Sequence, residues 1–115
     1  MYLINKNRNN EIILETLHYA NGFIDRLLGL IPYKRLSENE GMFLTECSSI
    51  HTFFMNFPID CFFIDKCFKV VKIKRNIPPM NVAIGSFSTK HIIEVSSVRR
   101  KPLSLDINDI VEIKN

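Results

Sequence analysis

Short runs of apolar residues, separated by polar turns, recur along the whole chain. They are rich in β-branched and aromatic side chains, which favour strands. The strands that this pattern predicts are 2–5, 11–19, 42–45, 52–55, 60–65, 69–74, 89–95 and 110–113. An asparagine-rich turn at 6–10 predicts a hairpin between the first two strands. Seven or eight short strands predict a mainly β fold, either a compact, mostly antiparallel β-sandwich or a squashed barrel.

One stretch has helical periodicity instead. We expect a short helix over 22–31, with Asn21 as its N-cap and Pro32 as its stop. Its apolar face would consist of Phe23, Ile24, Leu27, Leu28 and Ile31. Gly29 inside such a helix costs about 1 kcal/mol relative to alanine, which we interpret as room for a closely packed backbone. The second predicted strand could also be a short helix by its apolar spacing, but its β-branched content favours a strand.

The stretch 47–65 combines aromatic mass with the candidate chemistry of the chain. Met55 and the neighbouring phenylalanines are expected in the core; these are Phe53, Phe54, Phe57, Phe62 and Phe63. Polar residues interrupt the apolar runs, so they should lie at the edge of that core. They are His51, Thr52, Asn56 and Asp60. We therefore expect a polar pocket there, and the irregular connection 78–88 is long enough to shape its rim.

Length and charge limit the classes of function. A chain of 115 residues fits a single domain over 1–115, and its 46% hydrophobic share argues against disorder. Fifteen basic against 12 acidic residues give a net charge of only +3, too even a balance to indicate nucleic-acid binding. Two basic clusters are interpreted as solvated faces: Lys72, Lys74 and Arg75, and Arg99, Arg100 and Lys101.

The first residues of the chain and its cysteines indicate where in the cell the protein is expected. The start of the chain lacks a charged region followed by a long apolar one, and no apolar run is long enough to span a membrane. We expect a soluble, unexported, cytoplasmic protein. Its three cysteines are an odd, sparse set, so reduced thiols are expected.

Several short motifs follow one another between Ala20 and Ile113. They are Arg26-Leu27-Leu28-Gly29-Leu30, Glu40-Gly41-Met42, the run from Ile50 to Asp60, Phe63-Ile64-Asp65, Val70-Val71, Pro78-Pro79, Ile93-Glu94-Val95 and Asp109-Ile110-Val111. In this order they resemble the uncharacterised prokaryotic family called domain of unknown function 192. The resemblance implies a compact, mainly β domain with a short helix. It implies no settled activity, substrate or cofactor.

The chain departs from that family at two turns. The family usually has glycine after the position of Asp65, where this chain has Cys67 and Phe68, and before the late aspartate, where it has Asn108. Asparagine tolerates a positive φ, whereas phenylalanine tolerates it poorly. The turn type of the hairpin after Asp65 therefore stays open.

Cys47, His51 and Asp60 are the candidates for chemistry. A thiol, an imidazole and a carboxylate can together bind a transition metal, although the paired ligand spacing of zinc sites is missing, and Cys61 with Cys67 is a poor substitute. His51 could alternatively act as a base for a Cys47 nucleophile. The structural alternative is a buried Cys47 and a hydrogen-bonded His51, with Asp60 pinning a turn through backbone N–H groups.

Arg26 and Glu94 complete the candidate set. Arg26 could pair with Asp60 or Glu94 across the core edge, or the three could line a polar pocket. The chain has no glycine-rich phosphate loop, Gly-x-Ser-x-Gly elbow or His-Glu-x-x-His helix, and we expect no cofactor. The first hypothesis is thus a non-enzymatic domain that binds a small ligand or a protein partner. An enzyme or metal site using Cys47, His51 and Asp60 and a purely structural module are the alternatives.

Overall fold

The computed structural model describes residues 1–20 and 22–115. Within these residues the chain forms ten short strands and one short helix. The elements are β1 (Tyr2–Asn5), β2 (Glu11–Leu14), β3 (Thr16–Ala20), α1 (Phe23–Leu28), β4 (Glu40–Thr45), β5 (Ser49–His51), β6 (Ile59–Ile64), β7 (Val70–Ile77), β8 (Val82–Ile84), β9 (His91–Ser96) and β10 (Val111–Lys114). The prediction of a mainly β fold with one short helix is confirmed.

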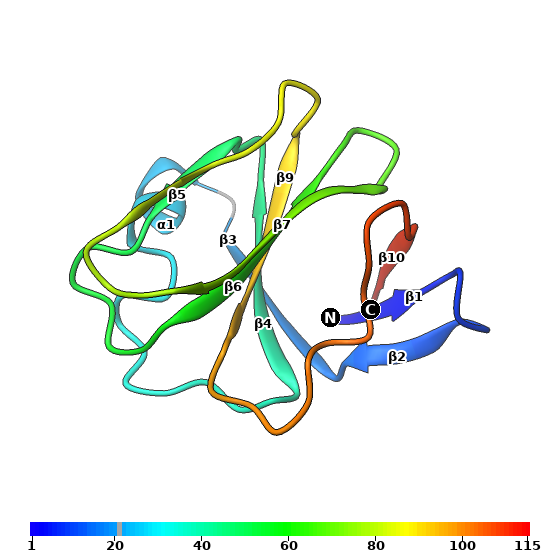
Figure 1. The fold of residues 1–115 in the computed structure, drawn as a ribbon, viewed down its shortest axis with the longest axis horizontal. Helices are drawn as coiled ribbons and strands as arrows, with labels where there is room; N and C mark the ends of the chain where they lie inside the picture. Colours follow the sequence, from blue (N-terminus) through cyan, green and yellow to red (C-terminus); the bar gives the residue numbers. More distant parts are fainter. Residues whose placement is uncertain (21) are drawn as a thin grey trace.

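The strands are arranged in three sheets around a central one. The central sheet has five strands in the order β3-β4-β9-β6-β7, and it does not close into a barrel. The sheet β10-β1-β2 lies on one side of it, and the pair β5-β8 lies with α1 on the other side (Figure 1). All pairs are antiparallel except β3 with β4. The expected mostly antiparallel pairing is therefore present in a layered arrangement.

Alternation along the central strands divides the core into two halves. On β6, Cys61 and Phe63 face the α1 side, whereas Phe62 and Ile64 face the β1-β2-β10 side. Every residue of β6 is buried, because both faces of the central sheet are covered. Fully burying one such phenylalanine contributes about 1.5–3 kcal/mol. The same alternation places Glu94 of β9, the register partner of Cys61, on the α1 side.

The run predicted as one strand over 11–19 is divided at Glu15. Its first part, β2, pairs with β1 as the predicted hairpin, and its second part, β3, joins the central sheet beside β4. Two further strands were not predicted: β8 lies in the connection 78–88 that we expected to be irregular, and β5 lies between two predicted strands. Together with the loss of the predicted strand 52–55, these differences give ten strands where eight were predicted.

The predicted strand 52–55 is wrong, because these residues form a turn. The Thr52 carbonyl accepts hydrogen bonds from the N–H groups of Met55 (3.2 Å) and Met80 (3.1 Å), so it is not available to a sheet. Phe54 has a φ of 64°. The turn exposes 38% of Phe53 and 76% of Phe54, which corrects the expectation that both are core residues. Met55 and the other three predicted phenylalanines are buried.

Helix α1 ends three residues earlier than predicted. Gly29 is its C-cap, with a φ of 47°, and donates its N–H to the Asp25 carbonyl at 2.8 Å. The glycine is therefore required by the left-handed conformation rather than by a neighbouring backbone. Asn21, the predicted N-cap, lies outside the described residues, and so do the side chains of Phe23, Ile24 and Leu27.

Both turns that depart from the family pattern have a positive φ. Phe68 has a φ of 62° and Asn108 a φ of 75°. At the first turn the Asp65 carboxylate accepts hydrogen bonds from the N–H groups of Cys67 (2.9 Å) and Lys69 (3.0 Å). The Phe68 ring stacks on His91 at 5.0 Å between centroids. These contacts hold the hairpin in a conformation that normally favours glycine.

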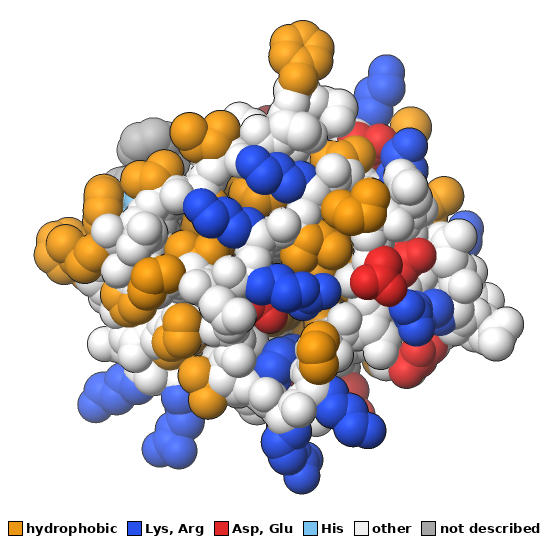
Figure 2. All heavy atoms as spheres, in the orientation of Figure 1, with side chains coloured by type: hydrophobic (Ala, Val, Ile, Leu, Met, Phe, Trp, Pro, Cys, Tyr) orange, Lys and Arg blue, Asp and Glu red, His pale blue; other side chains and the backbone are white. Residues whose placement is uncertain are grey.

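The surface in Figure 2 carries basic side chains over the middle of the molecule and acidic ones toward β10. The cluster in β7 is partly engaged within the chain. Lys72 donates to the Ile84 carbonyl at 2.6 Å, and Arg75 pairs with Asp60 at 3.7 Å. Among the described residues, no helix is long and apolar enough to cross a membrane.

Candidate functional site

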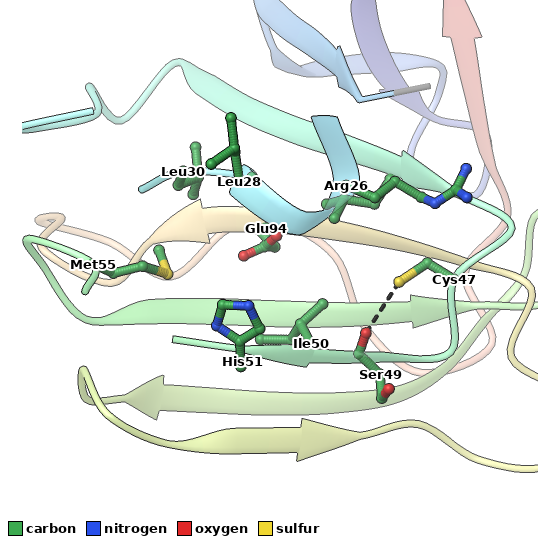
Figure 3. Close-up of a pocket in the computed structure, with 11 residues that line it drawn as sticks. Arg26, Leu28, Leu30, Cys47, Ser49, Ile50, His51, Met55 and Glu94 are labelled. Atoms are coloured by element: carbon green, nitrogen blue, oxygen red, sulfur yellow. Dashed lines mark hydrogen bonds between the residues drawn. The ribbon is translucent and has the colours of Figure 1, made fainter. Parts of the chain in front are cut away.

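A pocket of about 320 Å³ lies between α1 and the central sheet. Arg26 and Leu28 of α1 form one side, β5 forms the opposite side, and Glu94 of β9 lies between them (Figure 3). Most of the lining is apolar: Leu28, Leu30, Leu44, Ile50 and Met55. Ligand pockets range from about 300 to 1,000 Å³, so this one suits only a small molecule.

Glu94 is the unusual residue of this pocket. Only 2% of its surface is exposed, and its carboxyl has no hydrogen bond or ion pair with any residue that the structure describes. Burial alone raises the pKa of Glu94 to about 8, because water no longer solvates the charged form. The carboxyl is therefore mostly protonated at neutral pH, and it can donate one hydrogen bond and accept others.

Gly29 opens the space above this carboxyl. A Cβ atom at Gly29 would lie 3.6 Å from Glu94 Oε1, so a longer side chain there would contact the carboxyl. The left-handed φ of Gly29 turns the chain at the end of α1, and the buried Leu30 follows at the pocket wall. The helix end is thus shaped so that Glu94 keeps an open face.

Cys47 and His51 lie on the side of the pocket formed by β5 and the loop before it. The Cys47 thiol donates to the Ser49 carbonyl at 3.0 Å (Figure 3). Burial raises the pKa of Cys47, and Glu94 adds to this, which outweighs the lowering by Ser49 and Arg26. Nδ1 of His51 accepts the N–H of Phe53 at 3.3 Å. Cys47 is therefore held as a neutral thiol and not as a reactive thiolate.

The structure thus brings together four of the predicted site residues, namely Arg26, Cys47, His51 and Glu94. Thr52 does not line this pocket: it is fully buried, and its hydroxyl donates to the Pro78 carbonyl at 2.7 Å.

Asn56 also lies outside the lining. Its amide donates to the carbonyls of Ile31 (3.3 Å) and Tyr33 (2.8 Å). The amide ties the turn after β5 to the segment that follows α1. Both contacts are to backbone groups, so the Asn56 amide fixes chain segments.

Asp60 points to the other face of the central sheet. On β6 it alternates with Cys61, which faces the α1 side. Its carboxylate accepts the Asn76 N–H at 2.9 Å and pairs with Arg75, so it binds the neighbouring strand β7 and not the turn before β6 that we expected it to pin. Asp60 is therefore not brought together with Cys47 and His51. Across the described residues, no three His, Cys, Asp or Glu side chains are grouped as metal ligands.

A second hollow of about 490 Å³ lies on the other side of α1. It shares Leu28 and Gly29 with the first pocket. Its lining histidine, His18, already pairs with Glu40 at 2.9 Å. None of the polar residues described in the lining of the second hollow is buried, whereas Glu94 is, and this distinguishes the Glu94 pocket.

A family model named DUF192, "Uncharacterized ACR, COG1430", matches residues 3–113. The chain belongs to the DUF192 family. The match confirms the resemblance drawn from the motifs and extends it to the N-terminal hairpin. The comparison with curated proteins gives no match.

Two crystal structures resemble this DUF192 chain. A protein of unknown function from Novosphingobium aromaticivorans DSM 12444 has a TM-score of 0.83 at 17% identity, covering 98% of this chain and 84% of that one. A protein from Sinorhizobium meliloti 1021 named "putative transcription regulator" has a TM-score of 0.78 at 18% identity, covering 96% of this chain and 89% of that one. At these identities the likeness shows the fold alone.

The apolar lining of this DUF192 pocket was not predicted from the sequence. Leu30, Leu44 and Ile50 resemble any other core positions, so their pattern does not distinguish a pocket wall from packed core. Glu94 did leave a signal, because it interrupts the apolar run from Ile92 to Val95 on a strand buried on both faces. A carboxylate is rarely buried in such a place without a partner.

Proposed function

We propose that this DUF192 protein binds a small, largely apolar molecule through one hydrogen-bonding group, and does not transform it. The buried Glu94 carboxyl carries the proposal. Buried polar groups in native proteins are nearly always hydrogen-bonded, and one that lacks a protein partner calls for another. Here the carboxyl faces a pocket whose other walls are mainly aliphatic. That combination fits a ligand with an apolar body and one polar end.

The state of Cys47 argues against the enzyme alternative. Nucleophilic thiols are activated by a lowered pKa, whereas the pKa of Cys47 is raised and its S–H donates to a carbonyl. Asp60 lies on the opposite face of the sheet, so it does not orient His51. The described residues of the pocket therefore offer recognition and no assembled nucleophile.

Binding is tested by NMR titration of ¹⁵N-labelled protein with hexanol, a small molecule with an aliphatic body and one hydroxyl. We expect saturable amide shifts confined to residues that line the pocket. Leu28→Trp adds bulk at the rim and should weaken binding at least several-fold. The matched control is Ile84→Trp, which adds the same side chain at a 66%-exposed position outside the pocket and should leave binding unchanged.

Two results would count against the proposal. One is the absence of saturable shifts in a folded protein. The other is equal weakening by Leu28→Trp and Ile84→Trp, which would place the binding elsewhere. The amide spectrum of each variant reports directly whether it is folded, so loss of fold is not mistaken for loss of binding.

A further inference from the structure

The titratable and charged groups around the Glu94 carboxyl limit the charge that a ligand of this pocket can carry. Among the described residues, three titratable groups face it from the elements packed around it. They are Cys47 in the loop before β5, His51 on β5 and Cys61 on β6, the register partner of Glu94. The fourth group, Arg26 of α1, lines the same pocket with its guanidinium directed toward Cys47 (Figure 3). Both cysteines interact electrostatically with Glu94.

None of these four groups brings a negative charge to the pocket at neutral pH. Burial raises the pKa of both Cys47 and Cys61, so each is a neutral thiol. A histidine ring is neutral or positive, and the Arg26 guanidinium is always positive. With Glu94 itself protonated, the pocket is neutral to positive, so it favours an anionic group over a cationic one.

From this arrangement, and resting on the proposed function, we propose that the ligand is a small aliphatic monocarboxylate whose carboxylate accepts a hydrogen bond from the Glu94 carboxyl, in a pocket that Arg26 also lines. The ligand's hydrocarbon part would lie against Leu30, Leu44 and Met55. A hydrogen bond from a carboxyl to a carboxylate is charge-assisted and among the stronger ones in proteins. No covalent bond is broken, and the proton of Glu94 lies in the hydrogen bond between a Glu94 oxygen and an oxygen of the ligand.

The geometry makes one protonation state essential. If Glu94 lost its proton, its carboxylate and that of the ligand would face each other in an apolar pocket. Two neighbouring negative charges repel each other, so binding would be weakened. Binding should therefore follow the protonated fraction of Glu94. An amine ligand would behave in the opposite way, because an ammonium group pairs with the ionised carboxylate.

Isothermal titration calorimetry with hexanoate, hexylamine and hexanol separates these cases. Hexanoate should bind best near neutral pH. Its affinity should fall about tenfold from pH 7 to pH 9, because one unit above a pKa of about 8 only roughly a tenth of Glu94 keeps its proton. Glu94→Gln keeps a hydrogen-bond donor without titrating, so hexanoate binding to this variant should not change over the same pH range.

Arg26→Gln provides the second arm of the test. It should weaken hexanoate several-fold more than hexanol, because only hexanoate carries a charge that the guanidinium attracts, and retained hexanol binding shows that the pocket of the variant is intact. Equal weakening of the two ligands would contradict a role for the guanidinium in binding the anion.

The outcomes distinguish this inference from the proposed function. Tighter binding of hexylamine, strengthening as pH rises, would overturn the carboxylate assignment and leave a ligand pocket in place. Binding of hexanol without hexanoate would do the same. If none of the three compounds binds, the proposed function fails together with the inference. A pH dependence that persists in Glu94→Gln would show that another group controls binding.

Discussion

Glu94→Gln should make the protein more stable at neutral and alkaline pH. The pKa of Glu94 is raised from 4.5 to about 8 in the folded state, whereas an unfolded chain exposes an ordinary carboxyl. Between these two pH values the folded protein holds a proton that the unfolded chain has released. The free energy of unfolding therefore falls as pH rises through this window and levels off above the folded pKa.

The magnitude follows from the size of the shift. One pKa unit corresponds to about 1.4 kcal/mol, so a shift of this size costs the wild type on the order of 4–5 kcal/mol above pH 8 and little below pH 4.5. Only 2% of Glu94 is exposed, so solvent screens its charge little. Glutamine has nearly the same shape and stays neutral, so the variant avoids this cost at every pH.

Urea denaturation at several pH values between 5 and 9 measures the effect. The stability of Glu94→Gln minus that of the wild type should grow by roughly 3 kcal/mol between pH 5 and pH 8. Taking the difference removes the titration of all other groups. Glu112→Gln is the matched control, because Glu112 is a half-exposed carboxylate on β10, and its curve should run parallel to the wild type. Parallel curves for Glu94→Gln would refute the argument that Glu94 is buried without a partner.

Two further predictions concern residues outside the pocket. Thr52→Val should lower the free energy of unfolding by about 1–3 kcal/mol, because the Pro78 carbonyl and the Asn81 N–H lose the buried Thr52 hydroxyl as their partner. Thr52→Ser keeps the hydroxyl and should recover most of that loss in the same urea assay. Iodoacetamide followed by mass spectrometry should label the exposed Cys67 first and the fully buried Cys61 last, and early labelling of Cys61 would contradict its burial.

Periodicity predicted the parts of the fold that depend on local sequence. The boundaries of β1, β6 and β9 follow their apolar runs to within two residues, and nearly every residue of these strands is buried. The run 52–55 failed because its apolar residues are typical of a strand, whereas the Thr52 carbonyl is bonded within a turn. The division of 11–19 at Glu15 also depends on a partner, the distant strand β4. Hydrogen bonds between segments that are distant in the sequence are difficult to predict from the local pattern of one sequence.

The candidate site was predicted in part for the same reason. Cys47 and His51 were found because they are chemically distinctive and close in sequence. Asp60 was grouped with them by sequence proximity, but alternation on β6 turns it to the opposite face of the central sheet. Glu94 is far from these residues in sequence and comes next to them only because β9 pairs with β6 and β4. Its open face further depends on where α1 ends, a boundary that the apolar pattern placed too late.

The most direct test of the account is an NMR titration of the Glu94 side-chain carboxyl, with and without saturating hexanoate. We expect a pKa near 8 in the free protein, because the carboxyl is buried without a partner among the described residues. We expect a higher pKa in the presence of hexanoate, because a ligand that binds the protonated form stabilises it. A pKa close to the ordinary value of 4.5, or one that hexanoate leaves unchanged, would contradict the claim that Glu94 is the group that receives the ligand.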